Sequence, residues 1–266
     1  MKNQILAHLS TECPWRDTLY WYDTIDSTNT EAKRLAKAGA AHGTVLIAGN
    51  QTAGRGRMGR SFSSPGGQGV YLSVILRPAC SADQLMHLTC AAAVAGSNAV
   101  AKAADFTPSI KWTNDLVWQK KKLGGILTEL SFDNTTGLVE YAVIGIGINC
   151  TQKNDDFPPE LQDIATSVSQ ITGCDCSPAL LAARLTEALY AIDQQILYKK
   201  AEIMLLYRSR CITLGQAISI VRGDEIRHAT ALDLDDDGGL IVRLNDGQIT
   251  TVTSGEVSVR GMYGYL

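Results

Sequence analysis

The 266-residue chain lacks the features of a membrane-bound or exported protein. It contains no apolar run of about 18 residues or more, which argues against a membrane-spanning helix. Residues 1–6 carry no apolar stretch of the kind found in signal peptides. We therefore expect a cytoplasmic protein with no membrane partner.

The sequence also offers no disulfide framework and no zinc-binding pattern. Its seven cysteines are an odd number and include no Cys-x-x-Cys pair, so reduced thiols in the core fit better. The four histidines form no cluster with ligand spacing. A net charge of −3 leaves no basic excess, which argues against a nucleic-acid partner.

Acidic residues are missing from one long stretch of the chain. No Asp or Glu occurs between Glu31 and Asp83. Positive charge without a local counter-charge favours a small anionic ligand, with a basic surface patch as the simpler alternative. The cations in this stretch are Lys33, Arg34, Lys37, Arg55, Arg57, Arg60 and Arg77.

The rest of the composition is that of a globular protein, with 45% hydrophobic and 19% charged residues. The length suits one large domain, or one large domain and one small one. Apolar periodicity predicts helices at about 28–38, where Thr28 and Glu31 suggest a capping box, at 81–104 and at 177–210, the last in one or two pieces. It predicts strands at 44–48, 70–76, 110–112, 116–118, 123–130 and 139–148, with a hairpin tip at 120–122.

The pattern changes near residues 212–215, where we place a domain boundary. After it, short β-type runs alternate with turn signals such as Asp246-Gly247. About fifty residues of this kind predict a small β-barrel module. Residues 222–256 hold more acids than bases, which argues against a nucleic-acid-binding module. The predicted strands are 218–221, 229–234, 240–244, 249–252 and 257–259.

Residues 50–69 form a long Gly- and Ser-rich loop with three arginines. Gly54-x-Gly56-x-x-Gly59 matches the dinucleotide fingerprint only as a string, because a strand rather than a helix is predicted after it. The same stretch is one residue short of a P-loop, and Arg60 replaces the lysine. Glycine backbone N–H groups and forked arginines still suit a phosphate ligand, whereas a disordered basic loop is the alternative.

Five motifs, in order along the chain, resemble bacterial biotin–protein ligase. The resemblance covers roughly residues 25–266, and two positions depart from the family pattern: Thr113 replaces the usual Pro, and Phe62 replaces a common Trp. The motifs are Ser27-Thr28-Asn29, Gln51-Thr52-Ala53-Gly54-Arg55-Gly56-Arg57, Lys111-Trp112-Thr113-Asn114-Asp115, Lys122-Leu123-Gly124-Gly125-Ile126-Leu127-Thr128-Glu129 and Gly145-Ile146-Gly147-Ile148-Asn149.

This resemblance implies an α/β (α+β) fold with a class II aminoacyl-tRNA synthetase-like catalytic core. It also implies a small SH3-like β-barrel at the C-terminus, so we expect domains at 1–213 and 214–266. Some relatives carry an N-terminal DNA-binding domain and repress transcription. Only 26 residues precede Ser27 here, so we expect no repressor role. The family includes monomers and homodimers, and the sequence leaves that choice open.

The resemblance also implies a two-step reaction. The biotin carboxylate attacks the α-phosphate of ATP to give biotinyl-5′-AMP and pyrophosphate. A lysine of a biotin carboxyl carrier protein then attacks this anhydride, and AMP leaves. We expect Mg²⁺ with ATP, because a metal normally shields phosphate charge. Its ligands are not predicted: Glu129 is a candidate, but a solvent-facing strand glutamate is the simpler interpretation.

The resemblance assigns roles to individual residues. Lys111, Arg55 and Arg57 are the predicted catalytic residues, with Lys111 between the biotin carboxylate and the α-phosphate. The predicted biotin-binding residues are Ser27, Thr28, Asn29, Gln51, Gly54, Arg55, Gly56, Arg57, Lys111, Gly124 and Gly125. The predicted adenylate-binding residues are Arg55, Arg57, Arg60, Phe62, Lys111, Asn114 and Asn149.

Simpler roles and other functions remain as alternatives. Lys111 would otherwise be a solvated lysine at a strand end, Thr28 a helix cap and Asn114 a turn residue. Lipoate–protein ligase shares the core fold, but its Arg-Arg…Gly-Gly-Gly signature is absent. A non-catalytic biotin- or nucleotide-binding module is the second alternative, against which the presence of Lys111 and of the arginine loop argues.

Overall fold

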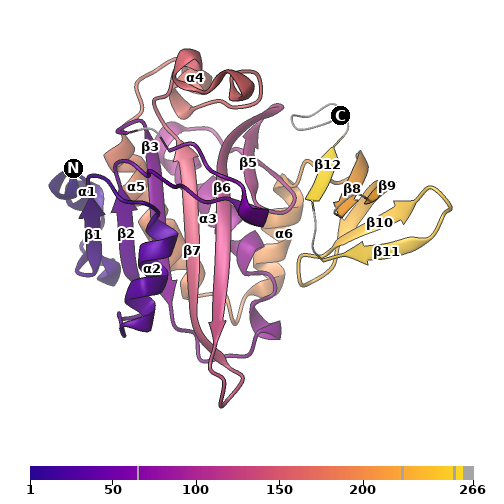
Figure 1. Ribbon diagram of the computed structural model, residues 1–266, viewed down its shortest axis with the longest axis horizontal. Coiled ribbons are helices and arrows are strands. Elements are labelled where there is room, and N and C mark those ends of the chain that lie inside the picture. The colour runs from indigo at the N-terminus through magenta and orange to yellow at the C-terminus, as the bar shows by residue number, and fades with distance from the viewer. Residues whose placement is uncertain (65, 223–224, 254–255, 260–266) are drawn as a thin grey trace.

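Two sheets form the framework of the computed structural model, which describes residues 1–64, 66–222, 225–253 and 256–259. The large sheet has seven strands in the order β1-β2-β3-β7-β6-β5-β4 (Figure 1). Its pairs are antiparallel except for β1 and β2. The strands are β1 (Leu19–Tyr22), β2 (Thr44–Ala48), β3 (Gly69–Leu76), β4 (Ser109–Lys111), β5 (Asp115–Trp118), β6 (Lys121–Phe132) and β7 (Val139–Asn149).

Helices cover both faces of the large sheet. Helix α2 lies in front of it, and α3 and α5 lie behind it (Figure 1). The α-helices are α1 (Lys2–His8), α2 (Thr28–Lys37), α3 (Leu88–Ala104), α4 (Val168–Thr172), α5 (Pro178–Asp193) and α6 (Lys200–Arg210). Short 3₁₀ turns occupy Pro14–Arg16, Arg57–Gly59, Asp83–Leu85, Asn154–Asp156 and Pro159–Leu161.

Alternation along the central strands explains this layering. Leu46, Ile75 and Val143 pack in a small cluster with Ala32 and Ala36 of α2. The residues between them on each strand point the other way and join the large core, which includes the buried faces of α3 and α5. The face covered by α2 has only this small apolar cluster, so polar residues and glycines are free to occupy the rest of it.

The small sheet contains five antiparallel strands in the order β11-β10-β9-β8-β12. Helix α6 lies between it and the large sheet (Figure 1). Each of the five predicted β-type runs is one of these strands. They are β8 (Ala217–Arg222), β9 (Glu225–Leu234), β10 (Leu240–Leu244), β11 (Ile249–Val252) and β12 (Glu256–Val259).

Several helices and strands differ from those predicted from the sequence. The capping box is wrong: Ser27 caps α2 by accepting from the Thr30 N–H, and Glu31 instead pairs with Arg34 at 2.6 Å. The predicted 81–104 helix begins only at Leu88, after a 3₁₀ turn. The 177–210 pattern is two helices, α5 and α6, and the sequence analysis missed α1 and β1. Among the residues that the structure describes, every helix is too short or too polar to span a bilayer.

Candidate functional site

Glycines hollow the centre of the large sheet on the face that α2 covers. The pairing register sets Tyr71, Gly147 and Gly125 in one row across β3, β7 and β6. Ser73, Gly145 and Leu127 form the next row. A Cβ atom on Gly147 would lie 2.6 Å from the Phe62 ring, and one on Gly145 would overlap the Asn29 side chain. The two glycines of β7 therefore allow neighbouring groups to lie directly on the strand backbone.

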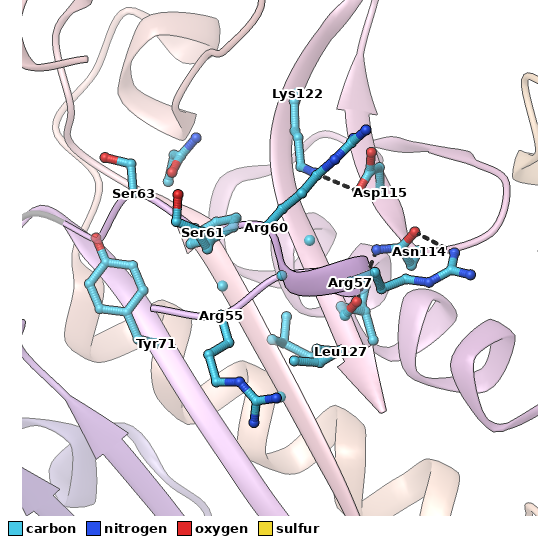
Figure 2. Close-up of a pocket in the computed structure, with 18 of the residues that line it drawn as sticks. Arg55, Arg57, Arg60, Ser61, Ser63, Tyr71, Asn114, Asp115, Lys122 and Leu127 are labelled. Carbon is cyan, nitrogen blue, oxygen red and sulfur yellow. Dashed lines mark hydrogen bonds and ion pairs between the residues drawn. The ribbon is translucent and has the colours of Figure 1, made fainter. Parts of the chain in front are cut away.

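A cavity of about 310 Å³ opens above this glycine floor (Figure 2). Its walls come from four segments that are distant in the sequence. They are the start of α2, the arginine loop (residues 54–61), the turn between β4 and β5, and the segment 157–165 that follows β7. The cavity thus has both polar and apolar walls, as small-molecule sites usually do.

The wall from α2 is a buried hydrogen-bond network. The Thr28 N–H donates to Gln51 Oε1 at 2.8 Å, and Gln51 Nε2 donates to Ser64 Oγ at 3.0 Å. Ser73 Oγ lies 2.7 Å from Thr28 Oγ1 and 2.6 Å from Asn29 Oδ1. Thr28 therefore does not cap the helix but ties it to the loop and to β3, leaving fixed donors and acceptors at the cavity wall.

The arginine loop contributes three guanidinium groups with different neighbours. Arg57 Nη1 donates to Asn114 Oδ1 at 3.1 Å, and Arg55 Nη1 lies 3.2 Å from Glu129 Oε1. Arg60 extends toward Asp115 and Lys122, whereas Arg55 extends toward the opposite end of the cavity (Figure 2). The three arginines are therefore spread along the cavity and do not converge on one point.

Two lysines complete the positive charge. Lys111, at the end of β4, lines the cavity and is only 7% exposed, so the alternative of a solvated strand-end lysine is wrong. Lys122 Nζ pairs with Asp115 Oδ1 at 2.7 Å, and both residues line the cavity. The sequence analysis assigned Lys122 to a hairpin tip, but β6 already begins at Lys121. Its place at the start of the Lys-Leu-Gly-Gly motif was the signal that could have identified it.

Another part of the cavity wall has aromatic and apolar groups. The Phe62 ring meets Tyr71 edge to face, with centroids 6.4 Å apart. Asn149 is buried at the end of β7 and donates to the Thr166 carbonyl at 2.9 Å. Segment 157–165 lies outside every predicted helix and strand, and the sequence analysis missed that it is a wall of the cavity. It contributes Phe157, Leu161, Ile164 and Ala165.

Glu129 has a different environment from the one expected. Its carboxylate lies 2.7 Å from Lys33 Nζ and accepts from Asn29 Nδ2 at 3.0 Å, so the expectation of a solvent-facing glutamate is wrong. Burial alone would raise the pKa of Glu129, but the bonds from Lys33 and Asn29 and the charges of Lys33 and Arg55 lower it overall. Within the described ranges, no three His, Cys, Asp or Glu residues gather as a metal site.

The structure thus gathers most of the predicted site residues around one cavity. Gly54 and Gly124 are not among its lining residues. Gly54 packs against the Phe62 carbonyl and Ser64, and Gly124 packs against the Gly147 carbonyl. The predicted residues that line it are Ser27, Thr28, Asn29, Gln51, Arg55, Gly56, Arg57, Arg60, Phe62, Lys111, Asn114, Gly125 and Asn149.

The positive charge of the acid-free stretch is less concentrated than expected. Lys33, Arg34, Lys37 and Arg77 are absent from the cavity lining. Arg34 pairs with Glu31, and Lys33 shares Glu129 with Arg55. Residues from outside the stretch therefore supply counter-charge that the linear sequence did not reveal.

Comparison with known proteins identifies a family. Residues 21–149 match the Biotin/lipoate A/B protein ligase family, and residues 213–260 match the Biotin protein ligase C terminal domain. Bifunctional ligase/repressor BirA of Bacillus subtilis is 36% identical over 250 residues, covering 92% of this chain and 75% of that relative. Biotin--[acetyl-CoA-carboxylase] ligase of Mycobacterium tuberculosis is 31% identical, covering 87% of this chain and 85% of that relative.

A solved structure agrees with the sequence comparisons. Biotin protein ligase from Aquifex aeolicus, in complex with biotin and ATP, superposes with a TM-score of 0.76 at 30% identity. The match covers 91% of this chain and 98% of that one, so it includes both sheets. The predicted mixed α/β fold with a small β-rich C-terminal part is confirmed. From its ordered motifs, its fold and these relatives, the chain belongs to the biotin protein ligase family.

Proposed function

We propose that this protein is an AMP-forming biotin–[biotin carboxyl carrier protein] ligase. It activates biotin as biotinyl-5′-AMP and transfers the biotinyl group to a lysine of the carrier. The observation that carries the proposal is one cavity that combines a polar, hydrogen-bonding wall with two lysines and three arginines. A relative named biotin--[acetyl-CoA-carboxylase] ligase and a solved relative in complex with biotin and ATP support it.

The polar end of the cavity suits the ureido ring of biotin. That ring carries both N–H donors and a carbonyl acceptor, so it needs partners of both kinds. Ser27, Thr28, Asn29 and Gln51 supply amide and hydroxyl groups. Thr28 and Gln51 bond to each other, whereas Ser27 and Asn29 are held by bonds to neighbouring residues. The bare backbone of Gly145 at the floor lets the Asn29 side chain lie directly on the strand at this end of the cavity.

The cationic middle of the cavity suits the reacting groups. The biotin carboxylate and the α-phosphate are both anionic and would repel each other as they approach. Lys111 is buried at the end of β4 and lines the cavity, and its charge would stabilise both anions at once. Lys122 and Arg57 add charge around the same space, whereas Arg55 lies beside Glu129. Positioning and charge stabilisation are the main requirements of such a step.

The other end of the cavity suits the nucleotide. The Phe62 ring offers a flat face over Gly147, and Asn149 and Asn114 offer polar groups nearby. Arg60 lines the cavity and extends toward Lys122 (Figure 2), so its guanidinium group could contact phosphate oxygens. Closure of the arginine loop would exclude water from an acyl-adenylate, which hydrolyses readily.

Mg²⁺ belongs to the proposal as a partner of ATP rather than as a resident metal. Asp115 is the one acidic residue among the described lining residues, and Lys122 already pairs with it. Mg²⁺ in such sites is commonly held by substrate phosphates and water, with one or two carboxylates. We expect EDTA to abolish adenylate formation and excess Mg²⁺ to restore it, without a change in the melting temperature of the ligand-free protein.

The organisation of the chain is part of the proposal. We propose a catalytic domain at 1–213 and an SH3-like domain at 214–266, acting in the cytoplasm on a carboxylase carrier protein. A homodimer and a monomer both suit this activity. Light scattering at several concentrations distinguishes the two states directly.

Biotin-dependent exchange of label between pyrophosphate and ATP tests the first step. We expect exchange with biotin and Mg-ATP, none without biotin, and transfer of biotin to a carrier domain when one is added. Exchange with lipoate but not with biotin would establish the lipoate ligase alternative. Binding of biotin without exchange under any condition would establish a non-catalytic module.

A further inference from the structure

We infer that Glu129 is a positioning residue for biotin: its carboxylate orients the side-chain amide of Asn29 at the cavity wall. This inference rests on the proposed function, because it assigns Glu129 a part in biotin recognition. Glu129 itself is not among the residues that line the cavity. It acts from the next row of the sheet, where it pairs with Val143 of β7.

The Glu129 carboxylate joins three segments of the chain. Oε2 accepts from Asn29 Nδ2 at 3.0 Å, and Oε1 lies 2.7 Å from Lys33 Nζ. Arg55 Nη1 lies 3.2 Å from Oε1 and 3.4 Å from Oε2. Asn29 and Lys33 belong to α2, and Arg55 belongs to the arginine loop. One residue of β6 therefore connects the cavity wall from α2 with the arginine loop.

The contact between Glu129 and Asn29 fixes which end of the Asn29 amide donates and which accepts. Asn29 Nδ2 donates to Glu129 and to the Leu127 carbonyl, so Asn29 Oδ1 must point at Ser73, 2.6 Å away. Oδ1 can only accept, and therefore the single Ser73 hydroxyl proton goes to Asn29. Thr28 Oγ1 also lies 2.7 Å from Ser73 Oγ, and its own proton goes to Gln51 Oε1 at 3.1 Å. The orientation of the Asn29 amide, and with it that of the Ser73 hydroxyl, therefore follows from the acceptor at Glu129.

A glutamine at position 129 could not replace this acceptor. A carboxylate accepts at both oxygens, whereas an amide has one accepting end and one donating end. All three neighbours of the Glu129 oxygens, Lys33 Nζ, Asn29 Nδ2 and Arg55 Nη1, are donors. An amide would therefore place its NH₂ group against one of them. With Lys33 removed as well, the amide carbonyl could turn to Asn29, and its NH₂ group would face only the Arg55 guanidinium, whose side chain is 42% exposed and can move into solvent.

This reasoning gives a specific experiment. We expect Glu129→Gln to raise the KM for biotin in pyrophosphate exchange, and the Kd for biotin in calorimetry, by about tenfold, the loss typical of a bond to a charged group. The KM for ATP should change by less than about threefold, because the Arg55 contact is longer and more exposed. The double variant Lys33→Met/Glu129→Gln should recover most of the biotin affinity.

The matched control is Glu140→Gln on the neighbouring strand. Glu140 is exposed, accepts from Ser131 Oγ at 3.0 Å and does not line the cavity, so its biotin KM should equal that of the unmodified protein. An unchanged biotin KM in Glu129→Gln overturns the inference. So does a double variant that binds biotin as weakly as Glu129→Gln, because that would indicate general disruption. If the unmodified protein shows no biotin-dependent exchange, the proposed function itself fails.

Discussion

At the scale of single residues, Lys111 carries the strongest functional expectation. It is buried at a strand end, in a cavity that also holds Lys122. A lysine in that position is costly unless it has a compensating role or partner. Lys111 was accessible from the sequence because it begins a recognisable motif. Lys122 was missed because a run of three lysines is typical of an exposed hairpin tip.

Substitution of Lys111 should separate catalysis from stability. We expect Lys111→Ala to lower the rate of biotin-dependent pyrophosphate exchange by about 100-fold or more, because it removes charge stabilisation where two anions meet. The melting temperature should stay within a few degrees of that of the unmodified protein. Lys120→Ala, in the exposed β5–β6 turn, is the matched control and should exchange normally. Unaltered exchange in Lys111→Ala would remove this residue from the active site.

The thiols of Cys150 and Cys176 make a second prediction at this scale. Cys150 Sγ donates to Cys176 Sγ at 2.8 Å, which lowers the pKa of Cys176 although burial opposes the change. The same contact and burial raise the pKa of Cys150. Because the thiolate is the reactive form, iodoacetamide near neutral pH should alkylate Cys176 before Cys150. Mass spectrometry of a labelling time course measures the order, and equal rates would contradict it.

At the scale of elements, the sequence allowed most strands and helices of the core to be predicted. Long apolar runs such as 70–76 and 139–148 have an unambiguous strand pattern, and both are strands. The site residues near recognisable motifs could be predicted for the same reason. The environment of Glu129 and the parts that Tyr71 and segment 157–165 play in the cavity could not, because they depend on the register of β3, β6 and β7 and on a loop that folds back over them.

The register of β7 makes a prediction about its glycines. In Gly145→Ala, the added Cβ would overlap Asn29, whose amide is already held by Glu129 and Leu127. We expect the Kd for biotin to rise by about tenfold or more, as expected for loss of a hydrogen bond with a charged partner. The protein should remain folded by circular dichroism.

A second glycine serves as the control for Gly145→Ala. A Cβ on Gly66 would meet only Asn50, at 3.7 Å, which is ordinary contact. Gly66→Ala should therefore bind biotin like the unmodified protein. If Gly145→Ala also binds biotin normally in calorimetry, the close approach of Asn29 to β7 is not needed for binding.

At the scale of the whole molecule, the small sheet is attached to the catalytic core next to Lys111. Trp112 Nε1 donates to the Gly238 carbonyl at 2.8 Å, and the Trp112 N–H donates to Thr213 Oγ1 at 2.9 Å. Arg208 of α6 adds a bond to the Leu234 carbonyl at 2.7 Å. The C-terminal part is therefore in direct contact with the turn that holds a predicted catalytic residue, which the sequence pattern alone could not indicate.

Loss of the indole bond should weaken this attachment measurably. Trp112→Phe keeps an aromatic ring but leaves the buried Gly238 carbonyl without its donor. We therefore expect the free energy of unfolding to fall by about 1–3 kcal/mol. Urea denaturation measures this difference. Trp118→Phe is the control, because Trp118 packs edge to face on Phe106 at 4.8 Å and phenylalanine retains that contact. Because Trp112 adjoins Lys111, Trp112→Phe should also slow pyrophosphate exchange. Normal stability together with normal exchange in this variant would show that the small sheet and the catalytic core act independently.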